Sequence, residues 1–319
     1  MAAIWLLGAC AAGTTRGQDS GMHPGGDLSI HDPSTIVKCK GRYWVFGTGW
    51  GVRAKSSLDL AAWKEGPRVF EKAPFWTTNT VPGNRGYFWA PDVVESCGRY
   101  LLYYSVSTWG SQNSAIGLAA NVTLDDTDRR YRWSDEGLVI HSCPTNDFNA
   151  IDPGVFLDSE KRLWMAFGSY WSGIKLVQLD PRTGKRADTN SPAVALAWHS
   201  SIEAPALCQR GNDYFLFVNW GQCCRGTNST YNIRVGRSKH VRGPYADKGG
   251  VSLMQDGGTL LLETNGRFIG PGHAGVYTEA GRNMFSFHYY DRDQKGTPKL
   301  AIRRLQWGSD GWPVVDSTE

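Results

Sequence analysis

One pattern of hydrophobic and polar residues occurs five times along the chain. Each copy has a polar residue near its start, continues with a short apolar run and a polar or glycine-containing turn, and ends in an aromatic-rich run. Two apolar runs of strand length separated by a turn predict an antiparallel β-hairpin. The copies read HDPSTIVKCKGRYWVFGTGW (31–50), APDVVESCGRYLLYYSVSTW (90–109), AIDPGVFLDSEKRLWMAFGSYW (150–171), IEAPALCQRGNDYFLFVNW (202–220) and GPGHAGVYTEAGRNMFSFHYY (270–290).

The spacing of these hairpins predicts the fold. The polar residues near the start of each copy recur roughly every 50 to 70 residues, and further strand patterns such as LDLAAWKEG (58–66) lie between the hairpins. Four strands in a unit of this length make one blade of a β-propeller. No segment shows a helical period of useful length. The chain is therefore expected to be an all-β protein, a single five-bladed β-propeller over residues 21–319.

The first polar residue of each hairpin is expected to point into a shared pocket. The first strand of a propeller blade is the innermost, and an antiparallel hairpin returns its second strand to the level where the first began. Each closing aromatic residue should therefore lie near the polar residue of its own hairpin. The alternative is that these residues only cap strands. The five polar residues are Asp32, Asp92, Asp152, Glu203 and His273.

Composition and charge agree with a soluble globular protein. Hydrophobic residues make up 41% of the chain and charged residues 20%, which is ordinary for that class. The net charge of +4 is spread along the chain without a Lys/Arg block, so nucleic acid is not an expected partner. No segment is apolar for long enough to span a membrane. Residues 1–20 are interpreted as a leader remnant or a disordered N-terminus, and LGAC (7–10) resembles a bacterial lipoprotein cleavage site.

Carboxylates clustered beside aromatic rings suit glycoside hydrolysis, in which one acid protonates the leaving oxygen and a second carboxylate activates water or attacks. Several stretches of the chain from about residue 30 to its end resemble glycoside hydrolase family 43, and most closely its α-1,5-L-arabinanases. The matching stretches are HDPS (31–34), WAPDV (89–93), STWGSQNSAIGLA (107–119), NAIDPGVF (149–156), SIEAPAL (201–207), CCRGTNSTYNIRVGRS (223–238), GPGHAGV (270–276) and LQWGSDGWPVV (305–315).

The resemblance implies an inverting mechanism with three acids. Asp32 matches the general base, Glu203 the general acid, and Asp152 the carboxylate that tunes and orients the acid. An inverting pair is set roughly 6.5–9.5 Å apart to leave room for water. Asp92 shares the repeat position but matches none of these roles, so a supporting structural role is expected for it. The substrate-contacting positions that the resemblance implies are His31, Trp89, Trp109, Asn149, Ser169, Trp171, Cys223, Cys224 and Arg225.

The resemblance also implies an ion and a disulfide. His273 matches an axial histidine that helps to hold a cation, usually calcium, largely through water; the alternative is a histidine bonded inside the tunnel. Calcium prefers oxygen ligands, so a histidine beside it indicates a hydrated ion. Members with CCRG can carry a disulfide between the adjacent cysteines, here Cys223 and Cys224, although two thiols remain the alternative. Cys39, Cys97 and Cys208 fall in hairpin turns of three blades and are expected to be free.

The expected activity is hydrolysis of arabinan and arabino-oligosaccharides by a secreted, periplasmic or cell-surface enzyme that acts as a monomer. Endo-action is the main interpretation. Exo-action, or an α-L-arabinofuranosidase or β-xylosidase activity of the same family, remains open, because the loops at 70–88 and 180–200 would decide whether the groove is open. A non-catalytic sugar-binding propeller is the alternative of another class. Such a protein would be expected to lack one of the three acids, and all three are present.

Overall fold

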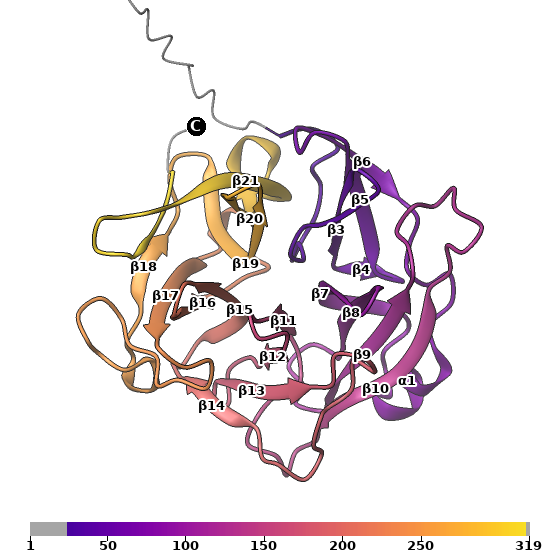
Figure 1. Cartoon of the computed structure of the whole chain (residues 1–319), viewed down its shortest axis with the longest axis horizontal. Helices are drawn as coiled ribbons and strands as arrows, with labels where there is room; N and C mark the ends of the chain where they lie inside the picture. Colours follow the sequence, from indigo (N-terminus) through magenta and orange to yellow (C-terminus); the bar gives the residue numbers. More distant parts are fainter. Residues whose placement is uncertain (1–23, 317–319) are drawn as a thin grey trace, which may run out of the picture.

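The computed structural model describes residues 24–316, which form five β-sheets arranged around a common axis (Figure 1). The predicted five-bladed β-propeller is confirmed. The leader predicted for residues 1–20 lies outside the described residues. One α-helix of six residues, α1 (Phe75–Thr80), occurs in the described part of the chain, inside the loop at 70–88. None of the helices in that part is long and apolar enough to cross a membrane.

The first unit of the chain contributes a short strand, β4, to the second blade. The first sheet has the order β1-β6-β5-β3-β2, and the second has the order β10-β9-β8-β7-β4. The strands of the first sheet are β1 (Gly25–Gly26), β2 (Val37–Cys39), β3 (Arg42–Gly47), β5 (Arg53–Ser57) and β6 (Ala62–Gly66). Those of the second are β4 (Gly49–Trp50), β7 (Tyr87–Ser96), β8 (Arg99–Val106), β9 (Ser114–Asn121) and β10 (Ser134–Ser142).

The other three blades are four-stranded meanders with the first strand at the inner edge. The third comprises β11 (Gly154–Leu157), β12 (Leu163–Phe167), β13 (Ile174–Leu179) and β14 (Val194–Ala197). The fourth comprises β15 (Ile202–Arg210), β16 (Asp213–Trp220), β17 (Asn232–Ser238) and β18 (Thr259–Leu262). The fifth comprises β19 (Phe268–Glu279), β20 (Arg282–Asp291), β21 (Thr297–Trp307) and β22 (Pro313–Val315). Short 3-10 helices are η1 (Gly226–Asn228), η2 (Leu253–Gln255) and η3 (Arg292–Gln294).

The hydrophobic core is divided among the interfaces between neighbouring blades. Strand β8 shows why, since its successive side chains point to opposite faces and both faces are buried. Leu102 and Tyr104 pack in a cluster with the first blade, whereas Leu101 and Tyr103 pack in a cluster with the third. Similar clusters lie between blades three and four, four and five, and five and one. Because both faces of such a strand are buried, its sequence is a continuous apolar run and not an alternation of apolar and polar residues.

The N-terminal segment closes the ring against the last blade. The Ile30 N–H donates to the carbonyl of Pro298, and the Leu300 N–H donates to the carbonyl of Leu28. Ile30 is buried in the cluster shared by blades five and one. These bonds and contacts join the first and last parts of the propeller, so that the axis is enclosed on all sides.

The positions of the closing aromatic residues differ between the blades. Trp220 pairs with Ile202 and so returns beside Glu203, as predicted. Trp50, by contrast, lies in β4 and pairs with Tyr87 of the second blade. Tyr290 pairs with Ile269, a few residues before the polar residue of its hairpin. In the fifth hairpin, bulges in β19 shift the pairing register, and in the first hairpin the chain leaves β3 at Gly47 and enters the separate strand β4; run lengths alone reveal neither feature.

Candidate active site

The inner strands carry a backbone kink where the predicted polar residues lie. Register shifts interrupt β7, β15 and β19 near these residues, so the regular alternation of side chains is broken there. A residue in the left-handed region occurs at or near the start of every inner strand: Asp32 (φ 50°), Ala90 (41°), Asp152 (56°), Ala204 (52°) and His273 (60°). Such a conformation costs about 1 kcal/mol or more per non-glycine residue and persists only where the surroundings enforce it. The kinks aim the polar side chains at the axis.

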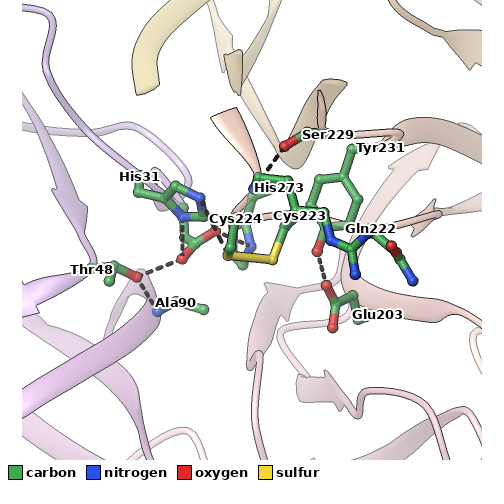
Figure 2. The surroundings of a disulfide bond; sticks show 12 residues. His31, Thr48, Ala90, Glu203, Gln222, Cys223, Cys224, Ser229, Tyr231 and His273 are labelled. Atoms are coloured by element: carbon green, nitrogen blue, oxygen red, sulfur yellow. Dashed lines mark hydrogen bonds and ion pairs between the residues drawn. A yellow bond between two sulfur atoms is a disulfide. The ribbon is translucent and has the colours of Figure 1, made fainter. Parts of the chain in front are cut away.

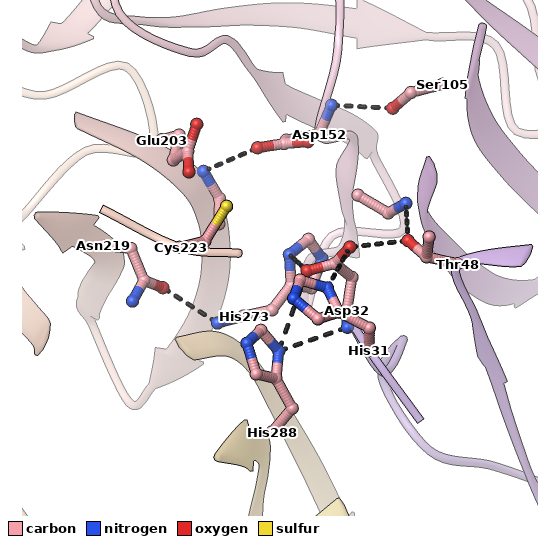
Figure 3. A network of polar contacts seen from close by, with 12 residues as sticks. His31, Asp32, Thr48, Ser105, Asp152, Glu203, Asn219, Cys223, His273 and His288 are labelled. Carbon is pink, nitrogen blue, oxygen red and sulfur yellow. Dashed lines mark hydrogen bonds and ion pairs between the residues drawn. The ribbon is translucent and has the colours of Figure 1, made fainter. Parts of the chain in front are cut away.

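Asp32 lies in a ring of histidines at the axis (Figure 3). His31 Nδ1 is 2.8 Å from its Oδ2, and the Thr48 hydroxyl donates to the same oxygen at 2.5 Å. His273 Nδ1 and His288 Nδ1 are each 3.7 Å from its Oδ1. Burial opposes ionisation of this carboxyl, but the three imidazoles outweigh it and lower its pKa well below the usual range. Asp32 is therefore ionised, as a general base must be.

Glu203 and Asp152 have the opposite electrostatic environment. Burial, together with the negative charge of Asp32, raises the pKa of Glu203 to about 7. Burial and the charges of Glu203 and Asp32 likewise raise the pKa of Asp152 well above its usual range. Two buried carboxyls that oppose each other's ionisation retain a proton near neutral pH. The site thus combines one ionised carboxylate with a carboxyl pair that can supply a proton.

Both oxygens of Glu203 are hydrogen-bonded. The Ser169 hydroxyl bonds to Oε2 at 2.7 Å, and the Tyr231 hydroxyl bonds closely to Oε1. Asp152 is fixed through its own backbone, since its N–H donates to Ser105 Oγ at 2.9 Å. Its Oδ2 accepts the N–H of Ala204 at 3.2 Å, next to Glu203 in the chain (Figure 3). Asp152 therefore supports the strand that carries Glu203, in addition to influencing its charge.

Asp92 joins three blades. Its Oδ1 accepts the N–H of Thr35 at 2.8 Å in blade one, and its Oδ2 accepts the N–H of Val155 at 2.7 Å in blade three. Burial raises its pKa to about 6. Both carboxylate oxygens are occupied by backbone donors, which agrees with the structural role expected for it.

The predicted sugar-contacting aromatic residues are accessible. The Trp89 and Trp109 rings lie 6.2 Å apart, edge to face, and the Trp109 side chain is 77% exposed. Trp171 is 43% exposed, and its carbonyl accepts the indole N–H of Trp198. Asn149 is buried, and its Oδ1 has no hydrogen-bond partner among the described residues. Exposed indole rings and an unpaired buried amide oxygen are suited to a ligand that offers apolar faces and hydroxyls.

Cys223 and Cys224 form a disulfide beside the acids (Figure 2). This prediction is confirmed, as is the expectation that Cys39, Cys97 and Cys208 are free. Cys224 Sγ lies 3.8 Å from His31 Nε2. Arg225, the next residue, is exposed, and its N–H donates to Ser229 Oγ at 3.1 Å.

Sequence reasoning missed three side chains of the site, although all lie in quoted motifs or repeats. Tyr231 belongs to CCRGTNSTYNI, and His288 and Tyr290 belong to the closing run of the fifth hairpin. His288 Nδ1 accepts the N–H of Asp32 at 3.2 Å, and its ring stacks on His31. The signal that could have found His288 is its two-residue spacing from Tyr290, which places both side chains on one face of a strand.

The model of the family described as Glycosyl hydrolases family 43 matches residues 24–313, nearly the whole described chain. The chain belongs to glycosyl hydrolase family 43. The resemblance seen in the sequence is thereby confirmed. Family membership, together with the geometry of the acids, makes this protein a glycoside hydrolase with its site at the propeller axis.

Two similar relatives and one similar solved structure carry names that refer to arabinofuranosidase or arabinanase activity. The chain is 40% identical to the extracellular exo-α-(1→5)-L-arabinofuranosidase ArbA of Cellvibrio japonicus, over 92% of this chain and 88% of that protein. It is 41% identical to the extracellular endo-α-(1→5)-L-arabinanase 1 of Bacillus subtilis, over 89% and 87%. A solved structure of Cellvibrio cellulosa α-L-arabinanase complexed with arabinohexaose matches with a TM-score of 0.86 and 38% identity, over 91% and 96%.

Proposed function

We propose that this glycoside hydrolase cleaves the α-1,5-L-arabinofuranosidic bonds of arabinan and arabino-oligosaccharides with inversion. The observation that carries the proposal is the contrast within one site: Asp32 is held ionised, while Glu203 has a pKa of about 7. An inverting hydrolase needs one carboxylate to accept a proton and one carboxyl to donate a proton. The arabinan-directed names of the relatives support this substrate class.

In the proposed reaction, Asp32 accepts a proton from a water molecule as the water oxygen bonds to the anomeric carbon. Glu203 gives its proton to the glycosidic oxygen as the bond between that oxygen and the anomeric carbon breaks. The products are a sugar with inverted anomeric configuration and a shortened chain with a free hydroxyl. Asp152 is the modulator: it and Glu203 oppose each other's ionisation, so the pair keeps a proton, and its bond to Ala204 orients the strand that bears the acid.

The residues around the acids would bind the sugar chain. The exposed rings of Trp109 and Trp171 provide faces for stacking against sugar C–H groups, with Trp89 beside Trp109. The unpaired Oδ1 of Asn149 is an acceptor for a sugar hydroxyl. The disulfide and the exposed Arg225 lie between β16 and β17 of the fourth blade, beside the acids.

The histidine ring around Asp32 fits a hydrated cation, for which calcium remains the candidate. His31, Asp32 and His288 offer ligand atoms within 4.8 Å of one another, and His273 joins them through Asp32. One carboxylate among imidazoles is a poor set for a dehydrated calcium ion, which prefers six to eight oxygens, but it can hold an ion that keeps most of its water. A bound cation would favour the ionised state of Asp32.

The names of the same relatives support a proposal for where the enzyme is located. Both are named extracellular, and we propose that this chain is likewise secreted. An extracellular setting is compatible with the disulfide, because disulfides persist in oxidising compartments.

Digestion of linear arabinan, followed by product chromatography, tests the proposed function. The wild-type enzyme should release arabino-oligosaccharides or arabinose, with a ladder of products for endo-action and one dominant product for exo-action. Glu203→Ala should be at least about a hundredfold slower, because a general acid contributes that much. Asp188→Asn, at an exposed surface loop, is the control and should match the wild type. Equal rates for the wild type and Glu203→Ala would contradict the proposal.

A further inference from the structure

The hydroxyl of Tyr290 lies between the disulfide turn and the histidine that contacts Asp32. The Cys224 N–H donates to Tyr290 Oη at 2.7 Å. Tyr290 Oη is in turn 2.7 Å from His31 Nε2, and His31 Nδ1 is 2.8 Å from Asp32 Oδ2. An uninterrupted chain of three bonds therefore runs from the backbone of the disulfide turn to the carboxylate. Figure 2 shows this turn beside His31.

The chain of bonds holds the His31 ring in one orientation. Tyr290 is 2% exposed, so its hydroxyl is fixed between the Cys224 N–H and His31 Nε2. The proton between Tyr290 and His31 can lie on either partner, and in both cases the Nδ1–H of His31 faces Asp32 Oδ2. Each bond thus orients the next group, and loss of the Tyr290 bond frees the His31 ring that contacts Asp32.

The disulfide holds the start of this chain in a costly conformation. Cys224 has φ 65°, in the left-handed region that residues other than glycine adopt at a cost of about 1 kcal/mol or more. Closure of the ring between adjacent residues restrains this backbone. Reduction by a dithiol would break the S–S bond, transfer two electrons and two protons to give two thiols, and oxidise the dithiol to its disulfide. The turn could then relax and withdraw the Cys224 N–H from Tyr290.

We propose that Tyr290 is a positioning residue that transmits the conformation of the Cys223–Cys224 turn, through His31, to Asp32. The inference rests on the proposed role of Asp32 as general base. It extends that role, because it makes the intact disulfide a requirement for full catalytic rate and not only a border of the sugar site.

The first test is Tyr290→Phe in the full chain with linear arabinan. The variant should lose kcat by roughly tenfold to a hundredfold, the effect of a misplaced catalytic group, while KM stays within about twofold. Tyr289→Phe is the matched control: it removes a hydroxyl from the adjacent residue, on the other face of β20, where the group lies 3.5 Å from Arg267 Nη2. This control should keep the kcat of the wild type. A higher KM with unchanged kcat in Tyr290→Phe would overturn the proposal.

The second test asks whether Tyr290 and the disulfide act as a unit. A dithiol reductant should lower the kcat of the wild type by about the same factor as Tyr290→Phe, and should have no further effect on that variant. A Cys223→Ser/Cys224→Ser double variant should have the kcat of the reduced wild type, and the reductant should not change it. Equal fractional losses in the wild type and Tyr290→Phe on reduction would overturn the proposal. So would a wild-type rate that reduction leaves unchanged after the disulfide is shown to be open.

Asp32→Asn separates this inference from the proposed function. If Asp32→Asn is inactive and Tyr290→Phe has the kcat of the wild type, only the positioning role fails. If Asp32→Asn is fully active, the proposed function itself fails. Thermal unfolding by circular dichroism verifies that each variant is folded, and reduction of the wild type keeps the proposal testable even if Tyr290→Phe does not fold.

Discussion

Replacement of Asp152 by Asn tests the electrostatic origin of the proton on Glu203. The substitution keeps the size of the side chain and an oxygen that can accept the Ala204 N–H, but leaves a group that cannot ionise. The charge of Glu203 raises the pKa of Asp152, and because this interaction is mutual, an amide at position 152 removes a negative charge that opposes the last deprotonation of the pair. Since the general acid must be protonated, the basic limb of the plot of kcat/KM against pH should move toward lower pH.

The expected size of this movement follows from the pKa of Glu203. Raising its pKa from 4.5 to about 7 corresponds to about 3 kcal/mol of preference for the protonated form. Burial and the charge of Asp32 raise the pKa of Glu203, and both remain in the variant. Loss of the ionisable neighbour should therefore move the limb by only about one pH unit, and not restore an ordinary carboxyl.

The assay is the initial rate of reducing-sugar release from arabinan between pH 4 and about 9. The substrate concentration is kept below KM, so that the rate follows kcat/KM and reports the pKa values of the free enzyme. The wild type should lose activity as the pH rises through about 7, where Glu203 gives up its proton. Asp158→Asn is the matched control, since Asp158 is another buried aspartate of the third blade but bonds to Arg162 and Trp164. A limb that stays in place in Asp152→Asn, or moves to higher pH, would refute the reasoning.

Three further predictions concern the frame, the sugar and the ion. Asp92→Asn should lower the free energy of unfolding in urea by about 1–3 kcal/mol, because an amide NH₂ would face a backbone N–H; a change below about 0.5 kcal/mol would contradict the bridging role. Trp109→Ala should raise KM for arabino-oligosaccharides roughly threefold to tenfold with little change in melting temperature, whereas an unchanged KM would exclude stacking on this exposed ring. Prolonged chelation should lower the melting temperature and the rate, and calcium should restore both; no response would count against the ion.

Most of the fold and of the site that could be predicted from the sequence followed from the five-fold repeat of the hairpin pattern. Five hairpins at similar spacing indicated five blades, because an inner strand, a turn and a second strand leave the same polar–apolar pattern in each copy. The polar residue near the start of each copy then predicted convergence, and Asp32, Asp152 and Glu203 do lie in one electrostatically connected site. The adjacent cysteines could be predicted to pair only through the family resemblance.

Other features depend on neighbours that are distant in the chain. Tyr231 reaches Glu203 from the residue just before β17 in the same blade, while Tyr290 reaches His31 across the junction of the last and first blades. No spacing rule connects residues 31 and 290. The left-handed conformation of residues in or near the inner strands could not be predicted from the sequence, since every non-glycine residue, even Asp or His, adopts it only in a minority of cases. The pairing of β4 with the second blade was not predicted either, because its partner residues lie far away in the chain.

The stereochemistry of the first product tests the central claim most directly. Proton NMR during the early hydrolysis of an α-1,5-linked arabino-oligosaccharide distinguishes the anomers before they interconvert. If Asp32 activates water opposite the leaving group while Glu203 protonates that group, the new reducing end should appear first as the β-anomer. Initial appearance of the α-anomer would mean that a carboxylate attacks the sugar directly, and would contradict the roles assigned to these two residues.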